Sequence, residues 1–165
     1  MRFTSAIVLS LFLAACSTSD QGGSSKTGTG STANTPAAST GPAAPAPGSQ
    51  AELNQTIGDR VFFDTDRYNI DAAANATVQA WAKWLARNPN VKVMIEGHAD
   101  ERGTRDYNFA LGARRSHAVK EALQNLGIAG NRIETTTFGK ERPAVLGSTP
   151  AAWAKNRRAV MVVAG

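Results

Sequence analysis

The sequence predicts an α/β (α+β) sandwich of two layers, in which a mixed four-stranded sheet carries helices on one face. From residue 51 onward, short β-prone segments alternate with segments of helical periodicity in the order β-α-β-α-β-(α)-β. Only a short connection precedes the last strand, so we do not expect a simple parallel crossover there. Residues 17–50 contain no aromatic residue and only two charges, so the core is expected to begin after them.

The first expected strand covers residues 59–63. The next segment, 71–87, has apolar residues at helical spacing, and Asp71 is a residue type that caps helix N-termini. Pro89 lies just beyond the last helical residue, where it would end the helix.

The remaining elements continue the alternation of strands and helices. A second strand is expected at 91–97 and a second helix at 107–126, with Gly127 as the residue that follows the helix in a left-handed conformation. The domain is then completed by a third strand at 132–138, a helical turn at 149–155 and a last strand at 158–163.

The first 15 residues have the pattern of a cleaved secretory signal. A basic start, Met1-Arg2, precedes an apolar stretch at 6–15 that is too short to cross a bilayer. The following tetrapeptide, Leu13-Ala14-Ala15-Cys16, is similar to the lipobox of bacterial lipoproteins, which implies that Cys16 is acylated and becomes the first residue. A free thiol, or an ordinary signal-peptidase site, is the alternative. The serine at position 17 favours the outer membrane by the same resemblance.

Residues 16–50 are expected to form a lipidated Cys16 followed by a flexible tether. Ser, Thr, Gly, Ala and Pro make up nearly all of this segment, and such a composition buries too little apolar surface to fold. A flexible chain of this length has an r.m.s. span of roughly 30–35 Å. The domain at 51–165 would therefore stay in the layer beneath its membrane, although a passive spacer would have the same composition.

The chain is basic, with a formal net charge of +5 that falls by one when Arg2 is removed with the signal. A basic domain can bind nucleic acid, but an exported, lipid-anchored protein does not meet nucleic acid. We therefore expect an anionic polymer of the envelope as the partner.

Polar residues are concentrated where the first two strands end. The first strand runs into Asp64-Thr65-Asp66, and the second runs into residues 98–102, which include Asp100 and Arg102. If these strands are parallel, both loops lie at the same carboxyl edge of the sheet, where ligands usually bind in open α/β sheets.

The second helix brings further polar side chains to this edge. Its sheet-facing stripe is expected to comprise Leu111, Ala118, Ala122 and Leu126. Asn108 and Arg115 share that face, and Asn108 lies near the helix N-terminus, where backbone N–H groups favour anions. An arginine on this face is costly unless its guanidinium meets water or an anion.

An ion pair of Arg115 with Asp66 or Asp100 explains this arginine about as well as a ligand does. The density of charges of both signs favours a ligand site. Carboxylates suit an ammonium group and arginines suit a carboxylate, so the cluster is typical of a site for a zwitterion. Its members are Asp66, Asp100, Arg102, Asn108 and Arg115.

Four segments resemble, in order, the motifs of a known family: FFDTDRYNI, GHADERGTRDYNFALGARR, FGKERPAVLG and AAWAKNRRAV. Over residues 58–163 the chain is similar to the peptidoglycan-associated lipoproteins, which carry an OmpA C-terminal-like domain. The resemblance implies noncovalent binding of peptidoglycan through the diaminopimelate of its stem peptide. It implies that Asp100 takes the ammonium group and Arg115 the carboxylate, in a pocket also lined by Asp66, Arg102, Asn108 and Leu111.

The resemblance also implies a place in the Tol system, with the periplasmic protein TolB as a partner during envelope constriction in cell division, and no cofactor. One departure from the family pattern is Arg105, which stands where a proline is frequent. A module that docks TolB without wall affinity of its own stays open as an alternative.

Two kinds of chemistry are not expected. A glycosidase needs two carboxyl groups at a set separation, and neighbouring arginines would keep both Asp66 and Asp100 ionised. A zinc site lacks suitable spacing, because His98 and His117 lie on different elements. His98 is instead expected to form local hydrogen bonds. Of the tryptophans, one fits the helix core, whereas Trp84 and Trp153 are left open between core and sugar platform.

Overall fold

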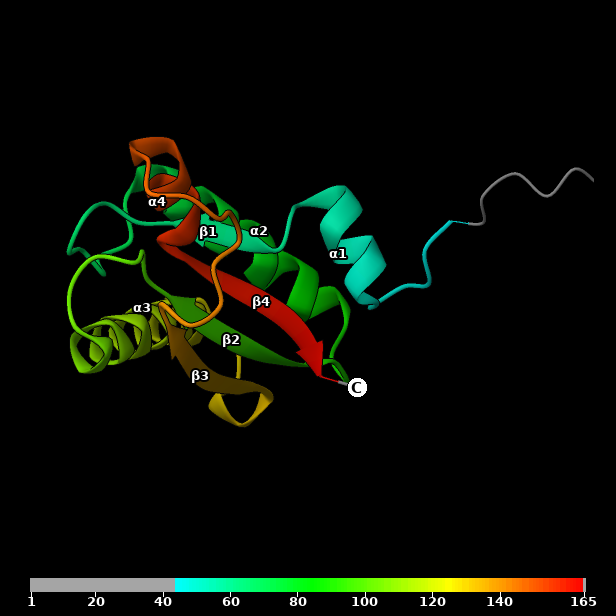
Figure 1. Ribbon diagram of the computed structural model, residues 1–165. Helices are drawn as coiled ribbons and strands as arrows, with labels where there is room; N and C mark the ends of the chain where they lie inside the picture. Colours follow the sequence, from blue (N-terminus) through cyan, green and yellow to red (C-terminus); the bar gives the residue numbers. More distant parts are fainter. Residues whose placement is uncertain (1–43, 165) are drawn as a thin grey trace, which may run out of the picture. The chain divides into compact units, whose positions relative to one another are not determined.

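Four strands form the sheet of the computed structural model, which describes residues 44–164. They are β1 (Arg60–Phe62), β2 (Lys92–His98), β3 (Ile133–Gly139) and β4 (Arg158–Ala164), in the order β1-β4-β2-β3 (Figure 1). β4 is antiparallel to β1 and β2, whereas β3 is parallel to β2. The mixed sheet is thereby confirmed, and β1, β2 and β3 all end at the same edge. The predicted signal peptide, Cys16 and the tether as far as residue 43 lie outside the described residues.

Four α-helices accompany the sheet. They are α1 (Gln50–Thr56), α2 (Ala72–Arg87), α3 (Arg105–Asn125) and α4 (Pro150–Asn156), and a 3-10 turn covers Gly130–Arg132. α2 and α3 pack on one face of the sheet, so the predicted two-layer fold is confirmed. None of the helices between residues 44 and 164 combines the length and the apolarity that a membrane span requires.

Side-chain and backbone caps fix the ends of the long helices. Asp71 caps α2 as predicted, and its Oδ1 accepts from the Ala74 N–H at 2.7 Å. α3 begins two residues earlier than predicted because Thr104 caps it. At its end, Gly127 has φ +90° and the N–H of Ile128 donates to the Leu123 carbonyl at 3.1 Å, which is the Schellman arrangement.

The stripe of α3 that faces the sheet differs from the prediction. Leu111 is buried as expected, but Leu126 is 45% exposed, because the helix ends at Asn125 and the chain turns away. The buried positions instead follow steps of four residues through Arg115 to Val119 and Leu123. Arg115 therefore lies in the middle of the sheet-facing stripe.

Helix α1, which begins at Gln50, has no counterpart among the predicted elements. This helix is held by polar contacts that a hydrophobic pattern does not reveal. The Gln50 side-chain amide accepts from Val163 N–H at 2.7 Å and donates to the Met161 carbonyl at 3.3 Å. These bonds occupy the edge of β4 beyond the short strand β1, where an unpaired edge would invite aggregation. Trp84 is fully buried, and its Nε1 donates to Glu52 of the same helix at 2.9 Å, so this tryptophan belongs to the core.

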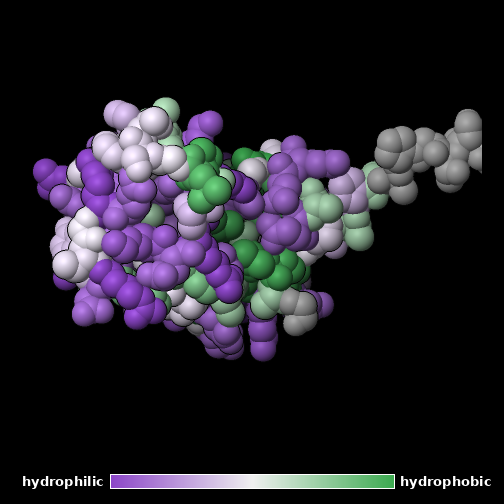
Figure 2. Space-filling model, in the orientation of Figure 1, coloured by the Kyte–Doolittle hydropathy of each residue, from purple (hydrophilic) through white to green (hydrophobic). Residues whose placement is uncertain are grey.

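A close approach between α3 and β2 positions the candidate site. A Cβ atom built on Gly97 would lie 1.9 Å from the carbonyl oxygen of Gly112, so only glycine allows this contact. It brings the first half of α3 against the end of β2. Figure 2 shows that the side of the domain on which β2 ends is mainly hydrophilic, whereas hydrophobic side chains gather along β4.

Candidate functional site

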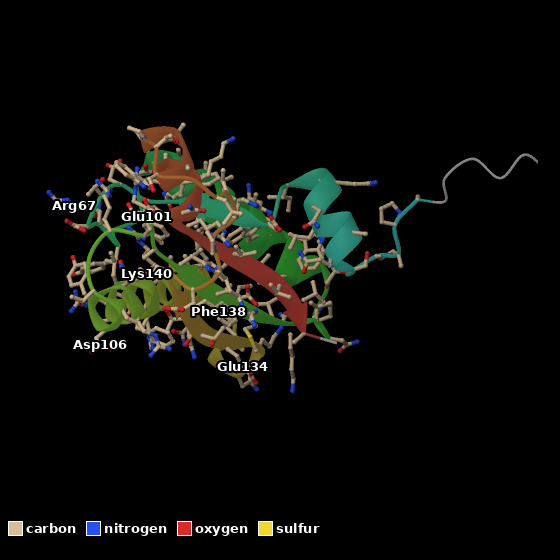
Figure 3. The ribbon with its side chains drawn as sticks, viewed as in Figure 1. Arg67, Glu101, Asp106, Glu134, Phe138 and Lys140 are labelled. Atoms are coloured by element: carbon tan, nitrogen blue, oxygen red, sulfur yellow. The ribbon has the colours of Figure 1, made fainter. Side chains whose placement is uncertain are left out.

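The loops after β1 and β2 meet at the carboxyl edge of the sheet. Figure 3 shows Arg67, Glu101, Asp106 and Lys140, which come from four separate segments, on this side of the domain. The Lys140 ammonium donates to the carbonyls of Glu101 and Gly103, at 3.3 and 2.8 Å, and so fixes the second loop.

Two hollows lie between these loops and the start of α3. An outer cavity of about 200 Å³ is lined by Thr65, Asp66, Asp100, Arg102, Gly103 and Tyr107. An inner cavity of about 10 Å³ is lined by Asp66, Asp100, Asn108, Leu111, Arg115 and Arg157. Two acids, Asp66 and Asp100, line both cavities. All six residues that the sequence analysis assigned to the site are therefore brought together.

Asp100 is a buried carboxylate in a shell of donors. Only 6% of the residue is exposed. Oδ1 accepts from the Arg102 backbone N–H and Nε, both at 3.1 Å, and Oδ2 accepts from Arg102 Nη2 at 2.6 Å and from Arg157 Nη1 at 3.4 Å. Burial opposes ionisation of Asp100, but the hydrogen bonds and charge of Arg102, with the bond from Arg157, lower its pKa below the usual value. Asp100 is thus an anion at neutral pH and not a proton donor.

Asp66 completes the acidic part of the site from the other loop. It has φ +54°, the only left-handed φ of a non-glycine residue between residues 44 and 164. Such backbone strain is concentrated at functional sites in proteins. The Asp66 side chain is exposed, and no hydrogen bond or ion pair holds it within the described part of the chain. Its carboxylate therefore has no protein donor among these residues.

Arg115 is fully buried, and within the described residues it makes no ion pair with Asp66 or Asp100, which the sequence left open as the alternative to a ligand. Its Nε donates to the Arg67 carbonyl at 2.8 Å, Nη1 to the His98 carbonyl at 2.8 Å and Nη2 to the Asp64 carbonyl at 3.0 Å. Backbone carbonyls, rather than an anion or bulk water, solvate this cation. The reason is topological, because the loop after β1 and the end of β2 both present carbonyls to Arg115.

The same contacts let Arg115 join the two loops of the site. Burial, followed by the charge of Arg157, lowers its pKa to about 10, so the guanidinium stays charged at neutral pH. Three of its five N–H groups point to the carbonyls. The other two make no bond to a carbonyl of the described residues, and Arg115 also lines the inner cavity.

Asn108 serves the site in a different way from the one predicted. It lies in the fourth position of α3, and its backbone N–H is bonded to the Thr104 carbonyl at 3.1 Å, so it offers no free backbone donor. Its side-chain Nδ2 instead donates to the Arg102 carbonyl at 2.7 Å. Asn108 therefore holds the loop that carries Asp100.

Arg157 is not among the predicted site residues, and the prediction for Trp153 leaves core and sugar platform open. Arg157 Nε donates to the Phe63 carbonyl at 2.9 Å, and its Nη1 reaches Asp100. Arg157 lies in the AAWAKNRRAV segment, but a position beside an expected strand does not indicate a site role. The Arg102 guanidinium lies 4.3 Å from the centre of the Trp153 ring, whose Nε1 donates to Glu101 at 2.9 Å. The half-buried Trp153 thus supports an arginine of the site.

His98 contradicts the expectation of local hydrogen bonds. The residue is 1% exposed, and neither ring nitrogen has a hydrogen-bond partner within the described residues. The ring stacks on Phe138 at 5.5 Å, and Nε2 is 3.6 Å from a carboxylate oxygen of Glu96. Burial, with repulsion from Arg158 and Arg142, lowers the pKa of His98 to about 4.

This histidine should make the fold sensitive to acid. Unfolded His98 takes up a proton below about 6.5, whereas the folded form stays neutral down to about 4. The free energy of unfolding should therefore fall as the pH drops from about 6.5 to about 4, by up to roughly 3 kcal/mol at about 1.4 kcal/mol per pKa unit. Urea unfolding of the full chain across this window measures the loss. His98→Phe should remove most of this loss of stability. His117→Gln, which changes an exposed histidine, should leave the loss as large as in wild type. Equal losses in all three proteins would show that His98 does not cause the acid sensitivity.

No group of three or more His, Cys, Asp or Glu side chains between residues 44 and 164 is arranged to hold a metal ion.

Residues 62–157 match the model of the OmpA family. Over 122 residues the chain is 51% identical to the peptidoglycan-associated lipoprotein of Rhizobium meliloti (strain 1021), which covers 74% of this chain and 69% of that protein.

Solved structures agree with the sequence matches. The crystal structure of the peptidoglycan-associated lipoprotein from Burkholderia pseudomallei is similar with a TM-score of 0.63 and 42% identity, over 64% of this chain and 90% of that one. The C-terminal domain of Helicobacter pylori MotB has a TM-score of 0.61 at 18% identity, over 65% of this chain and 84% of that one. This second likeness shows the fold alone.

Proposed function

The chain belongs to the OmpA family and, within it, to the peptidoglycan-associated lipoproteins. We therefore propose that it binds peptidoglycan noncovalently through the diaminopimelate of the stem peptide. Acylated at Cys16, it would tie the outer membrane to the wall from the periplasmic side, as a structural protein and not an enzyme. The observation that carries this proposal is that an ionised, buried Asp100 and a buried Arg115 both line the inner cavity.

Each charge of the site has a counterpart on the end of a diaminopimelate side chain. Asp100 and the unpaired carboxylate of Asp66 suit the ammonium group. The N–H groups of Arg115 that do not bind carbonyls, together with Arg102, suit the carboxylate. Leu111 and Asn108 would shape the wall beside them.

A single site of this kind binds with modest affinity, because a few charge-assisted bonds must also offset the loss of motional freedom on binding. Many copies anchored in one membrane would face many stem peptides of one wall, and such multivalency raises the overall strength of attachment. The Tol system, with TolB as the partner, would then act on the same carboxyl edge during envelope constriction at cell division.

Co-sedimentation with purified sacculi tests this function. The full chain, kept soluble in mild detergent, should pellet with sacculi whose stem peptides carry diaminopimelate. It should stay in solution with sacculi that carry lysine at that position, because lysine lacks the carboxylate. Equal sedimentation with both walls, or with neither, would contradict the proposal. Failure to sediment combined with capture of TolB would instead favour the docking module.

A further inference from the structure

We propose that Arg102 determines the specificity of the site by occupying Asp100 when no ligand is bound and releasing it only to a ligand that carries a carboxylate beside its ammonium group. This inference rests on the proposed function and deepens it. It concerns the choice between a free and an amidated carboxylate on diaminopimelate, and between diaminopimelate and lysine.

The carboxylate of Asp100 already receives as many donor contacts as it can accept. A carboxylate offers about four lone-pair positions, and four donor contacts from Arg102 and Arg157 already reach Asp100. An incoming ammonium group cannot simply add to this set. It must replace one of the donors.

The Arg102 side chain is the donor that can leave. It is 42% exposed, whereas the Arg157 side chain is 14% exposed and is also tied to the Phe63 carbonyl. Two of the four contacts on Asp100 come from the Arg102 guanidinium, at 3.1 and 2.6 Å. The contact from the Arg102 backbone N–H does not depend on where the side chain lies.

A displaced Arg102 has other contacts at hand within the outer cavity. Its guanidinium already lies over the Trp153 ring, and its Nη2 is 3.3 Å from the Thr65 hydroxyl. Asp66 lines the same cavity without an ion pair of its own among the described residues. The side chain can therefore turn away from Asp100 within the outer cavity while it stays against the tryptophan.

Exchange on Asp100 favours a zwitterion over a simple cation. A lone ammonium group only replaces bonds that Arg102 already makes to Asp100. The displaced Arg102 guanidinium then stays close to the ammonium group as a second cation. A ligand carboxylate beside that ammonium gives the displaced guanidinium a bidentate partner. Discrimination thus includes a repulsive element against ligands that lack the carboxylate. The free acid of diaminopimelate meets this condition, but its amide and lysine do not.

Calorimetric titration with two muropeptides tests the inference. One carries diaminopimelate with its free carboxylate and the other carries the amide, and both are titrated into the full chain in detergent. Wild type should bind the free acid at least about tenfold more tightly, as expected when a charge-assisted bond is lost. Arg102→Gln should bind the amide several-fold more tightly than wild type does, because Asp100 has lost its internal competitor, so the preference for the free acid should shrink.

Arg105→Gln is the matched control. It removes the same charge from the same edge, but Arg105 pairs with Glu141 and does not touch Asp100. Its two affinities should stay close to those of wild type. Arg102→Lys keeps the positive charge but lacks the fork geometry of the guanidinium. Its preference for the free acid over the amide should lie between those of wild type and Arg102→Gln. This variant keeps the inference testable if Arg102→Gln folds poorly.

The outcomes separate this inference from the proposed function. If wild type binds neither muropeptide, the proposed function fails and the inference fails with it. If wild type binds the free acid but Arg102→Gln does not gain affinity for the amide, the inference alone is overturned and Arg102 is an ordinary ligand contact. A parallel loss for both muropeptides with a lowered melting temperature would assign Arg102 a structural role and would also overturn it.

Discussion

Replacing Asp100 with asparagine should prevent the full chain from sedimenting with diaminopimelate-containing sacculi. The substitution keeps the shape of the side chain but removes the charge that would hold the ligand ammonium. It also leaves the positive charges of Arg102 and Arg157 without their anion, so that the site would repel an ammonium group. Charge-assisted bonds contribute about 1.5–3 kcal/mol each. We therefore expect the affinity for a single muropeptide to fall by about 100-fold or more.

Asp64→Asn is the matched control for this substitution. Asp64 is an exposed acid at the same edge and undergoes the same chemical change, yet it lines neither the outer nor the inner cavity. Its backbone carbonyl, which receives Arg115, is unaffected. Sedimentation of Asp64→Asn should match that of wild type. Equal losses of sedimentation in both variants would show that the effect comes from net charge alone. Sedimentation of Asp100→Asn at the wild-type level would show that Asp100 does not bind the ligand.

Arg115→Met should destabilise the fold more than any other single substitution in the site. Its guanidinium satisfies three carbonyls of the two loops. A buried acceptor left without a donor costs about 1–3 kcal/mol, and methionine keeps the apolar stem but supplies no donor. We expect the free energy of unfolding to fall by about 3–5 kcal/mol. Urea unfolding followed by circular dichroism measures this loss.

Arg114→Met provides the comparison, because Arg114 is the exposed neighbour of Arg115 on the same helix. Its loss should change stability by less than about 0.5 kcal/mol. Equal and small effects of both substitutions would contradict the role of Arg115 in joining the loops. The expected result has a practical consequence: loss of wall binding in an Arg115 variant cannot by itself identify a ligand contact.

The sequence was sufficient where periodicity and end signals agree. Asp71 and Gly127 mark helix ends through their own chemistry, and the alternation of strands and helices defines the sheet and its layers. The convergence of the candidate residues could also be predicted, because parallel strands bring their carboxyl ends to one edge and because α3 carries Asn108 and Arg115 on one face.

The sequence was insufficient where side chains choose among several partners. Arg115 was expected to need water or an anion, but three backbone carbonyls from distant segments meet it instead. Arg157 reaches Asp100 from a residue just before β4, and no local pattern indicates such a long-range contact. His98 was expected to be bonded and is not. In each case the tertiary arrangement, and not the neighbouring sequence, decides whether the side chain has a hydrogen-bond partner and which one it is.

Backbone amide shifts during a titration with a diaminopimelate-containing muropeptide test the central claim most directly. The ¹⁵N-labelled full chain in detergent micelles would report where the ligand lies. We predict the largest shifts at Thr65, Asp66 and residues 100–103, which surround the outer cavity. The claim would be contradicted by shifts confined to the neighbouring groove of about 440 Å³, which is lined by Phe62, Ala154 and Lys155 among others, or by a spectrum that does not change.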